Sequence, residues 1–222
     1  MAIDHCVMRF IFDRPLKEGA RAKDLRGAIA SLCRENPLFH QHTDDSSLIF
    51  SYPLIQYKIL EGGAFLVGLG DGAKAVAQLN LLDERLRIGT EPYIVRHQEI
   101  GFGKSEIGIM NEMIEYYFLS PWLALNTRNY QSYQRTGSLE KRRELLRKVL
   151  VGNIISLSKG IGYDVPDRIY GRIMEFEEVP VVLKDTSMIG FFGSFRANFL
   201  IPTLWGIGKS VSRGFGTVIT SL

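Results

Sequence analysis

Apolar positions in the first half of the chain change between the period of a strand and that of a helix. Ile3–Phe12 ("IDHCVMRFIF") is rich in β-branched and apolar residues with partial alternation, which predicts a strand. In residues 25–32 apolar side chains recur at i, i+3, i+4 and i+7, which predicts an amphipathic helix that ends at Asn36-Pro37. A strand followed by a helix is therefore expected to open the fold.

Short apolar runs follow this first pair, with one further helix. Gly62-Gly63 predicts a hairpin turn, and Ala73–Leu82 predicts the second helix. The predicted strands are Ser47–Ser51, Leu54–Leu60, Ala64–Gly70, Glu84–Ile88 and Tyr93–Gln98. The order is β-α-β-β-α-β with an added hairpin, which is the ferredoxin-like arrangement.

The pattern restarts after the glycine-punctuated segment "IGFGKSEIG" at residues 100–108. Ser138 is a capping candidate for a helix with one apolar face and a basic opposite side. Strands are predicted at Tyr116–Leu125, Arg168–Glu178, Pro180–Leu183, Met188–Leu200 and Thr217–Leu222. We expect an α+β protein with two ferredoxin-like (RRM-like) βαββαβ domains in tandem, at residues 1–105 and 106–222.

Composition supports a folded globular protein and excludes several classes. Of the 222 residues 45% are hydrophobic and 23% charged, and the net charge of +3 is only mildly basic. Cys6 and Cys33 lack C-x-x-C spacing and no secretory leader opens the chain, so we expect reduced thiols and a cytoplasmic protein. Arg196, Asn198 and Pro202 interrupt the most apolar stretch, so no membrane segment is expected.

The segment "GIGKSVSRGFG" at residues 206–216 suggests a cradle for phosphate. A P-loop would need glycine where Thr203 stands, and a dinucleotide fingerprint would need glycine where Val211 stands. What remains is a loop whose backbone N–H groups, with Lys209, Ser210 and Arg213, line the backbone of a polyanion. The plainer alternative is a pair of turns before a terminal strand.

Two histidines stand in the polar stretch "NPLFHQHTDDSS" after the first helix. His40 and His42 could be ordinary surface residues, or could form a metal site with Asp44 and Asp45. The third reading is acid/base chemistry at a phosphodiester, because an imidazole near its ordinary pKa exchanges a proton with a ribose 2′-OH near neutral pH. The sequence leaves all three open.

The combination resembles a known family. The stretches "FHQH" (39–42), "FSYPLIQYKI" (50–59) and "GIGKSVSRGFG" resemble the CRISPR-associated repeat-processing endoribonucleases, the Cas6 family of the RAMP superfamily. The resemblance implies cleavage of CRISPR precursor RNA within each repeat into guide RNAs. The cleavage would use 2′-OH attack without a metal or cofactor, leaving a 5′-OH and a 2′,3′-cyclic phosphate.

The same resemblance assigns roles to individual residues. His42 and His40 match the catalytic region, and Tyr52 and Lys58 match positions that orient the scissile group, although "YPLIQYK" also fits an ordinary half-buried strand. The residues that would bind RNA are Gly206, Gly208, Lys209, Ser210, Arg213, Gly214 and Gly216. The expected partner is CRISPR repeat RNA, and other CRISPR-associated proteins and a second copy of the chain are further candidate partners. The alternative function is a non-catalytic RNA-binding RAMP subunit.

Overall fold

The chain separates into two compact units, which are described individually. The computed structural model describes residues 1–40, 52–183 and 186–220. The N-terminal unit contains Ala2–Ser105 together with Val211–Gly214, and the C-terminal unit contains Met1, Glu106–Ser210 and Phe215–Leu222. A short part of the glycine-rich segment therefore belongs to the N-terminal unit.

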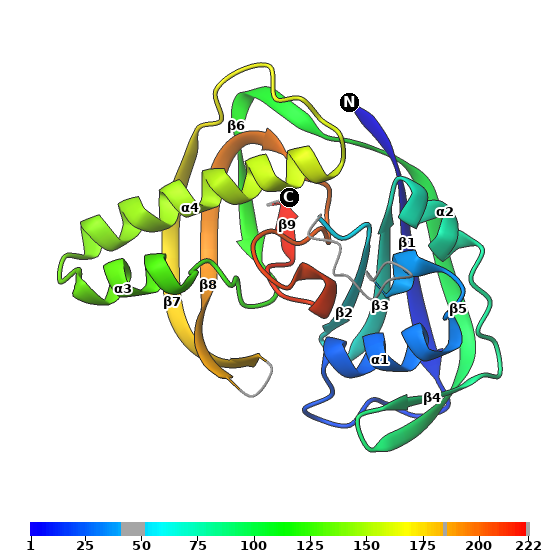
Figure 1. The fold of residues 1–222 in the computed structure, drawn as a ribbon. Coiled ribbons are helices and arrows are strands. Elements are labelled where there is room, and N and C mark those ends of the chain that lie inside the picture. Colours follow the sequence, from blue (N-terminus) through cyan, green and yellow to red (C-terminus); the bar gives the residue numbers. More distant parts are fainter. Residues whose placement is uncertain (41–51, 184–185, 221–222) are drawn as a thin grey trace. The chain divides into compact units, whose positions relative to one another are not determined.

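The N-terminal unit is a five-stranded sheet with two helices on one face (Figure 1). The strands lie in the order β2-β3-β1-β5-β4, and the pairs β1–β3, β2–β3 and β4–β5 are antiparallel. The elements are β1 (Ala2–Phe12), α1 (Ala22–Leu32), η1 (Pro37–Phe39), β2 (Ile55–Leu60), β3 (Gly63–Leu69), α2 (Asp71–Ala77), β4 (Arg85–Ile88) and β5 (Glu91–Glu106). The predicted ferredoxin-like order and its added hairpin are confirmed.

The helices bury the apolar stripe that the sequence periodicity predicted. Leu25 and Ile29 of α1 and Val76 of α2 are fully buried in one cluster with Met8 and Leu66 of the sheet. Burying side chains of this size contributes about 1.5–3 kcal/mol each relative to exposure. This packing fixes α1 on the sheet.

The C-terminal unit repeats the arrangement with a four-stranded sheet in the order β7-β8-β6-β9. Leu146, Leu150 and Ile154 on one face of α4 are fully buried, and α4 packs against β7 (Figure 1). The elements are β6 (Gly108–Phe118), α3 (Thr127–Arg135), α4 (Leu139–Gly160), β7 (Gly171–Leu183), β8 (Thr186–Leu200) and β9 (Val218–Thr220), with η2 (Val211–Arg213) before β9. The described part of this unit has a glycine-rich segment where a second ferredoxin helix would stand.

Several boundaries differ from the sequence prediction. β5 continues through the glycines at 101 and 103 to Glu106, and α3 was not predicted because its sequence is almost wholly polar. Two predicted strands are one, β7, which passes through Pro180. Proline is tolerated there because β7 is an edge strand and needs no second hydrogen-bond partner. The predicted strand at Ser47–Ser51 lies outside the described residues.

None of the helices in the described ranges is long and apolar enough to cross a membrane. Ser138 is the N-cap of α4 as predicted, but its side chain makes no capping hydrogen bond.

The contact of α2 with β3 depends on a glycine and yields a stability prediction. A Cβ at Gly68 would meet the carbonyl group of Gly72 and lie 2.7 Å from the Cα of Ala73. Gly68→Ala should therefore destabilise the protein by about 2 kcal/mol or more, because α2 must move away from the sheet. Urea unfolding measures the change.

Gly27→Ala provides the matched control in the same unit. Gly27 lies in α1 with nothing within 4 Å of an added Cβ, so this substitution should stabilise by about 0.5–1 kcal/mol through helix propensity. Equal effects of the two substitutions would contradict the close approach of α2 to β3.

Candidate functional site

Close packing requires glycine at three positions of residues 206–216, namely Gly208, Gly214 and Gly216. A Cβ at Gly208, where φ is +94°, would lie 2.7 Å from the Trp122 indole. Gly216, with φ of +63°, donates its N–H to the Pro121 carbonyl at 2.9 Å and accepts from the N–H of Ile207. Gly206 and Gly216 are buried, and Gly208 and Ser210 are partly exposed. The segment is therefore well packed, and glycine is needed where backbones approach.

Lys209 is held in the C-terminal unit by its own backbone and side chain. Its N–H donates to the carbonyl of Leu123 at 3.2 Å, and its Nζ donates to the carbonyl of Leu125 at 3.0 Å. Partial burial lowers the pKa of the Lys209 ammonium. This predicted RNA-binding cation therefore has a fixed position beside a small cavity that Asn126 and Asn153 also line.

The next residues of the segment pack in the N-terminal unit, against α1 and the edge strand β2. Gly214 has φ of +87°, and a Cβ there would lie 2.6 Å from the Cβ of Ala22 and 3.1 Å from the Tyr57 carbonyl oxygen. Any other residue would push η2 away from α1. The contact fixes the neighbouring Arg213 beside α1.

Arg213 lies close enough to Arg26 for its positive charge to act on the Arg26 guanidinium. Burial lowers the pKa of the Arg26 guanidinium, and the nearby positive charge of Arg213 lowers it further. Arg26 also donates from Nη2 to the carbonyl oxygen of His40 at 2.7 Å. Sequence reasoning missed Arg26, because no motif marks it and only the packing of α1 places it here.

His40 is positioned by the short helix η1. Asn36 caps η1 by accepting from the N–H of Leu38 at 3.1 Å, and the Tyr57 hydroxyl donates to the carbonyl of Phe39 at 3.1 Å. Nε2 of His40 lies 3.0 Å from the carbonyl oxygen of Cys33. A carbonyl only accepts, so Nε2 carries the hydrogen and Nδ1 of the neutral ring is the nitrogen that takes up a proton. His42 lies outside the described residues, as do Asp44 and Asp45.

Tyr52 and Lys58 are joined by a side chain that the sequence prediction omitted. Gln56 donates from Nε2 to the Tyr52 hydroxyl at 2.7 Å, and Nζ of Lys58 donates to Oε1 of Gln56 at 2.9 Å. Gln56 and Lys58 are completely buried, and burial lowers the pKa of Lys58 to about 7. The alternation of β2 is the sequence signal that could have identified Gln56. Gln56 and Lys58 share one face of the strand, while Ile55 and Tyr57 on the other face enter the core.

The N-terminal unit thus brings His40, Arg26 and Arg213 into one connected cluster. Two guanidinium groups supply positive charge, and one of them bonds to the backbone carbonyl of His40, whose ring has a defined proton-accepting nitrogen. Such a cluster can bind an anion such as phosphate and exchange a proton next to it. Lys209 belongs to the other unit.

The burial of Lys58 predicts how stability depends on pH. The pKa of Lys58 falls from 10.5 to about 7 on folding, so the unfolded chain binds this proton more tightly. The cost is complete below the folded pKa and disappears as pH rises towards the unfolded value. Lys58→Met should therefore stabilise the protein strongly near pH 7 and less near pH 9, by up to about 1.4 kcal/mol for each pH unit between them.

Urea unfolding at both pH values measures this difference. The exposed Lys17 provides the control for loss of charge, since Lys17→Met removes an ammonium that already lies in water. A stabilisation by Lys58→Met that is the same at both pH values would contradict the lowered pKa.

Comparison with known proteins covers the whole chain. Residues 1–106 match the family model of the Cas6b N-terminal domain, and residues 108–221 match that of the Cas6b C-terminal domain. A relative from Methanocaldococcus jannaschii, the uncharacterized protein MJ0978, is 39% identical over 151 residues, which cover 68% of this chain and 97% of that protein.

Solved structures agree with the family models. A crystal structure of Cas6b has a TM-score of 0.91, and one of the CRISPR RNA processing endoribonuclease Cas6b has a TM-score of 0.79. Each is 30% identical to this chain, and each match covers both chains completely. The structure of Csf5, a type IV Cas6 crRNA endonuclease, has a TM-score of 0.59 at 14% identity; the match covers 99% of this chain and all of that chain. At this identity the match shows that the two proteins have the same fold. The predicted family and tandem ferredoxin-like fold are confirmed: the chain belongs to the Cas6b family.

Proposed function

We propose that this protein is an endoribonuclease that processes CRISPR RNA by cutting within its repeats. Membership of the Cas6b family supports this, as does the similarity to a structure described as a CRISPR RNA processing endoribonuclease. The observation that carries the proposal in this chain is the cluster of His40, Arg26 and Arg213.

The paired guanidinium groups favour a phosphate ligand. Two like charges at a partly buried position raise the free energy of the unliganded site, and a bound anion removes that penalty. Guanidinium groups also match phosphate oxygens with two parallel hydrogen bonds. Arg26 and Arg213 would then hold a phosphodiester of the repeat beside His40.

The chemistry follows from the hydrogen bonds of the imidazole. Nδ1 of His40 would accept the proton of the ribose 2′-OH, the O2′–P bond would form, and the P–O5′ bond would break in line with it. The leaving O5′ takes up a proton from solvent, so the products are a 5′-OH and a 2′,3′-cyclic phosphate. The guanidinium charges would stabilise the phosphoryl oxygens, so the reaction needs no metal ion. His42 is the second candidate for the proton transfers.

Tyr52 and Lys58 would act through the buried hydrogen-bonded trio with Gln56. Lys58 and Gln56 are completely buried and Tyr52 is partly exposed, so Tyr52 is the member of the trio suited to facing a ligand. Lys58 and Gln56 would hold that hydroxyl in position.

Cleavage of the host's CRISPR repeat RNA in excess EDTA tests the reaction. The wild-type protein should cut it, and a single 2′-deoxy substitution at the cut site should abolish cutting because the nucleophile is gone. His40→Ala should reduce the single-turnover rate about 100-fold or more if His40 transfers the proton. His42→Ala is measured beside it.

The exposed His97 of β5 is the matched control, and His97→Ala should leave the rate unchanged. Unchanged rates in both the His40 and His42 variants would refute the assignment. Binding of the repeat without any cleavage would favour the alternative of a non-catalytic RAMP subunit.

Arg213→Ala should weaken binding of the repeat RNA about tenfold, as expected for loss of a charge-assisted hydrogen bond to phosphate. The slope of log affinity against log salt should fall by about 0.7, since one fewer cation is released. Arg96, which pairs with Asp83 on the surface, provides the control. An unchanged slope for Arg213→Ala would show that no phosphate lies there.

A further inference from the structure

A groove in the C-terminal unit contains none of the residues assigned to the proposed reaction. Its volume is about 460 Å³, which lies within the usual range of ligand-binding pockets. The α4 side of the groove carries Arg147, Lys148, Val151 and Ile155, and the segment before β7 supplies Val165 and Asp167–Tyr170. The groove thus combines basic, apolar and aromatic side chains.

Tyr170 presents an exposed ring in this groove. The side chain is 54% exposed, and the guanidinium carbon of Arg168 lies 5.4 Å from the ring centroid. Ile169 between them is only 6% exposed and anchors the segment in the core. A large aromatic ring in water gains free energy when another planar group covers it.

Asn198 of β8 holds the backbone of this segment. Its Oδ1 accepts from the N–H of Tyr170 at 2.6 Å, and its Nδ2 donates to the Arg168 carbonyl at 3.1 Å. Its own N–H donates to the Tyr170 carbonyl at 3.2 Å. The exposed ring therefore stands on a fixed backbone, which lowers the entropy cost of binding a ligand on it.

The charges around the groove favour an anion. Arg147, Lys148 and Arg168 outnumber two carboxylates: that of Asp167, which accepts from the N–H of Arg168 at 2.6 Å, and that of Glu144, which pairs with Arg147 at 2.6 Å. Lys148 is 70% exposed, and its nearest carboxylate is that of Glu144 at 3.8 Å.

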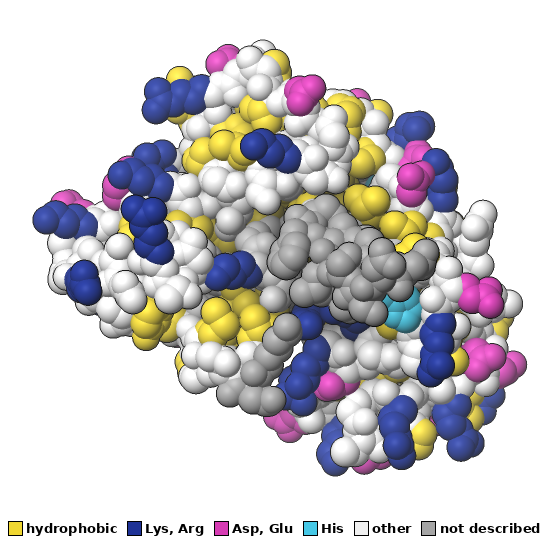
Figure 2. Space-filling view, in the orientation of Figure 1, with side chains coloured by type: hydrophobic (Ala, Val, Ile, Leu, Met, Phe, Trp, Pro, Cys, Tyr) yellow, Lys and Arg dark blue, Asp and Glu magenta, His cyan; other side chains and the backbone are white. Residues whose placement is uncertain are grey.

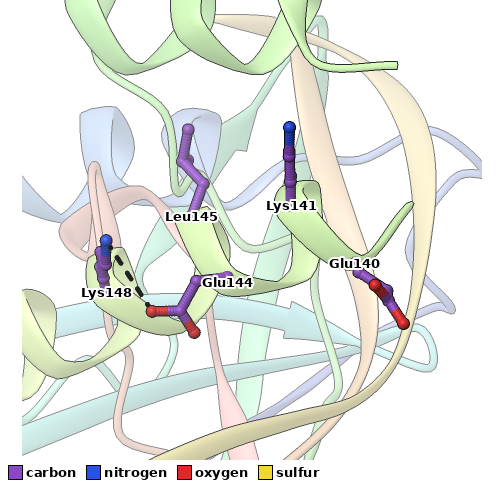
Figure 3. A pocket seen from close by; sticks show the side chains of 5 residues that line it. All are labelled: Glu140, Lys141, Glu144, Leu145 and Lys148. Atoms are coloured by element: carbon purple, nitrogen blue, oxygen red, sulfur yellow. Dashed lines mark ion pairs between the residues drawn. The ribbon is translucent and has the colours of Figure 1, made fainter. Parts of the chain in front are cut away.

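Lys148 also borders a second hollow on α4. Figure 3 shows Lys148 on α4 with Lys141 and Leu145 and with an ion pair to Glu144, and these residues line that hollow together with Glu140. Figure 2 shows Lys and Arg side chains recurring along this helix with apolar side chains between them. Cations beside apolar and aromatic surface are what a single-stranded nucleic acid requires.

We propose that this groove is a subsite for single-stranded RNA, with one base stacked on Tyr170 and neighbouring phosphates held by Lys148 and Arg168. The inference rests on the proposed function, since it assumes that the ligand of this chain is RNA. It adds a binding site that would set affinity without taking part in cleavage. An acidic protein segment would use the cations but would leave in water the part of the Tyr170 ring that Arg168 does not cover.

Titration with a non-cleavable RNA tests the subsite. The probe is the single-stranded host repeat carrying a 2′-deoxy group at the cut site, and the variants are Tyr170→Ala and Tyr170→Phe of the full chain. Tyr170→Ala should raise the dissociation constant about tenfold, and Tyr170→Phe should not, because phenylalanine keeps the stacking surface. With a saturating concentration of the unmodified repeat, whose 2′-OH is intact, both variants should cleave at the wild-type rate.

Two controls separate stacking from general effects. Tyr130 of α3 is 43% exposed in the same unit, and Tyr130→Ala should leave the affinity unchanged. Tyr170→Ala removes no charge, so the salt slope should stay constant, whereas Lys148→Ala should lower it by about 0.7. Polyglutamate is titrated as an acidic protein probe.

Three results would overturn the subsite. They are an affinity of Tyr170→Ala equal to that of Tyr130→Ala, an equal loss for the Phe and Ala variants, or a loss for polyglutamate as large as that for RNA. If the wild-type protein cuts the repeat while Tyr170 has no effect, only the subsite is rejected. If the wild-type protein does not bind the repeat at all, the proposed function fails as well.

Discussion

The close contact of Gly214 with α1 and β2 is the constraint on which the candidate site depends. The Cβ that any other residue would carry lies within 2.6 Å of Ala22, so only glycine lets the η2 segment reach the helix. That contact places a residue from near the C-terminus, Arg213, beside Arg26 and thus near the backbone of His40. Without this contact, the positive charge of Arg213 would not lie near Arg26, which bonds to the backbone of His40.

Electrostatics in the N-terminal unit is arranged at a cost in stability. Two guanidinium groups repel each other, and the completely buried ammonium of Lys58 donates to the neutral amide of Gln56. Such groups persist where a ligand or a reaction uses them, since an apolar core would be more stable. The two groups differ in how they treat charge. The cluster of His40, Arg26 and Arg213 places two positive charges near each other, whereas the trio of Tyr52, Gln56 and Lys58 buries one ammonium away from water.

The two units share a topology but differ in what their helices carry. In the N-terminal unit α1 supplies Arg26 to the proposed reaction site, and in the C-terminal unit α4 supplies Arg147 and Lys148 to a groove beside Tyr170. In both units one helix face packs on the sheet and leaves the other face free to carry charge. Tandem copies of one fold can thereby separate the binding of RNA from its cleavage.

The apolar periodicity of the sequence by itself determined the ferredoxin-like order of both halves, because each buried stripe needs a sheet to cover it. Separate signals marked the glycine-rich segment and His40 as candidates: glycines interleaved with Lys209, Ser210 and Arg213, and two histidines in a polar stretch after the first helix. Their roles stay predictions. The apolar periodicity missed α3, whose polar sequence has no stripe, and it divided β7 into two strands at Pro180, because only sheet order shows that β7 is an edge. Tertiary structure alone decided that Gly214 packs on α1, that Arg26 joins Arg213, and that Lys58 is buried, because these depend on contacts between residues far apart in the chain.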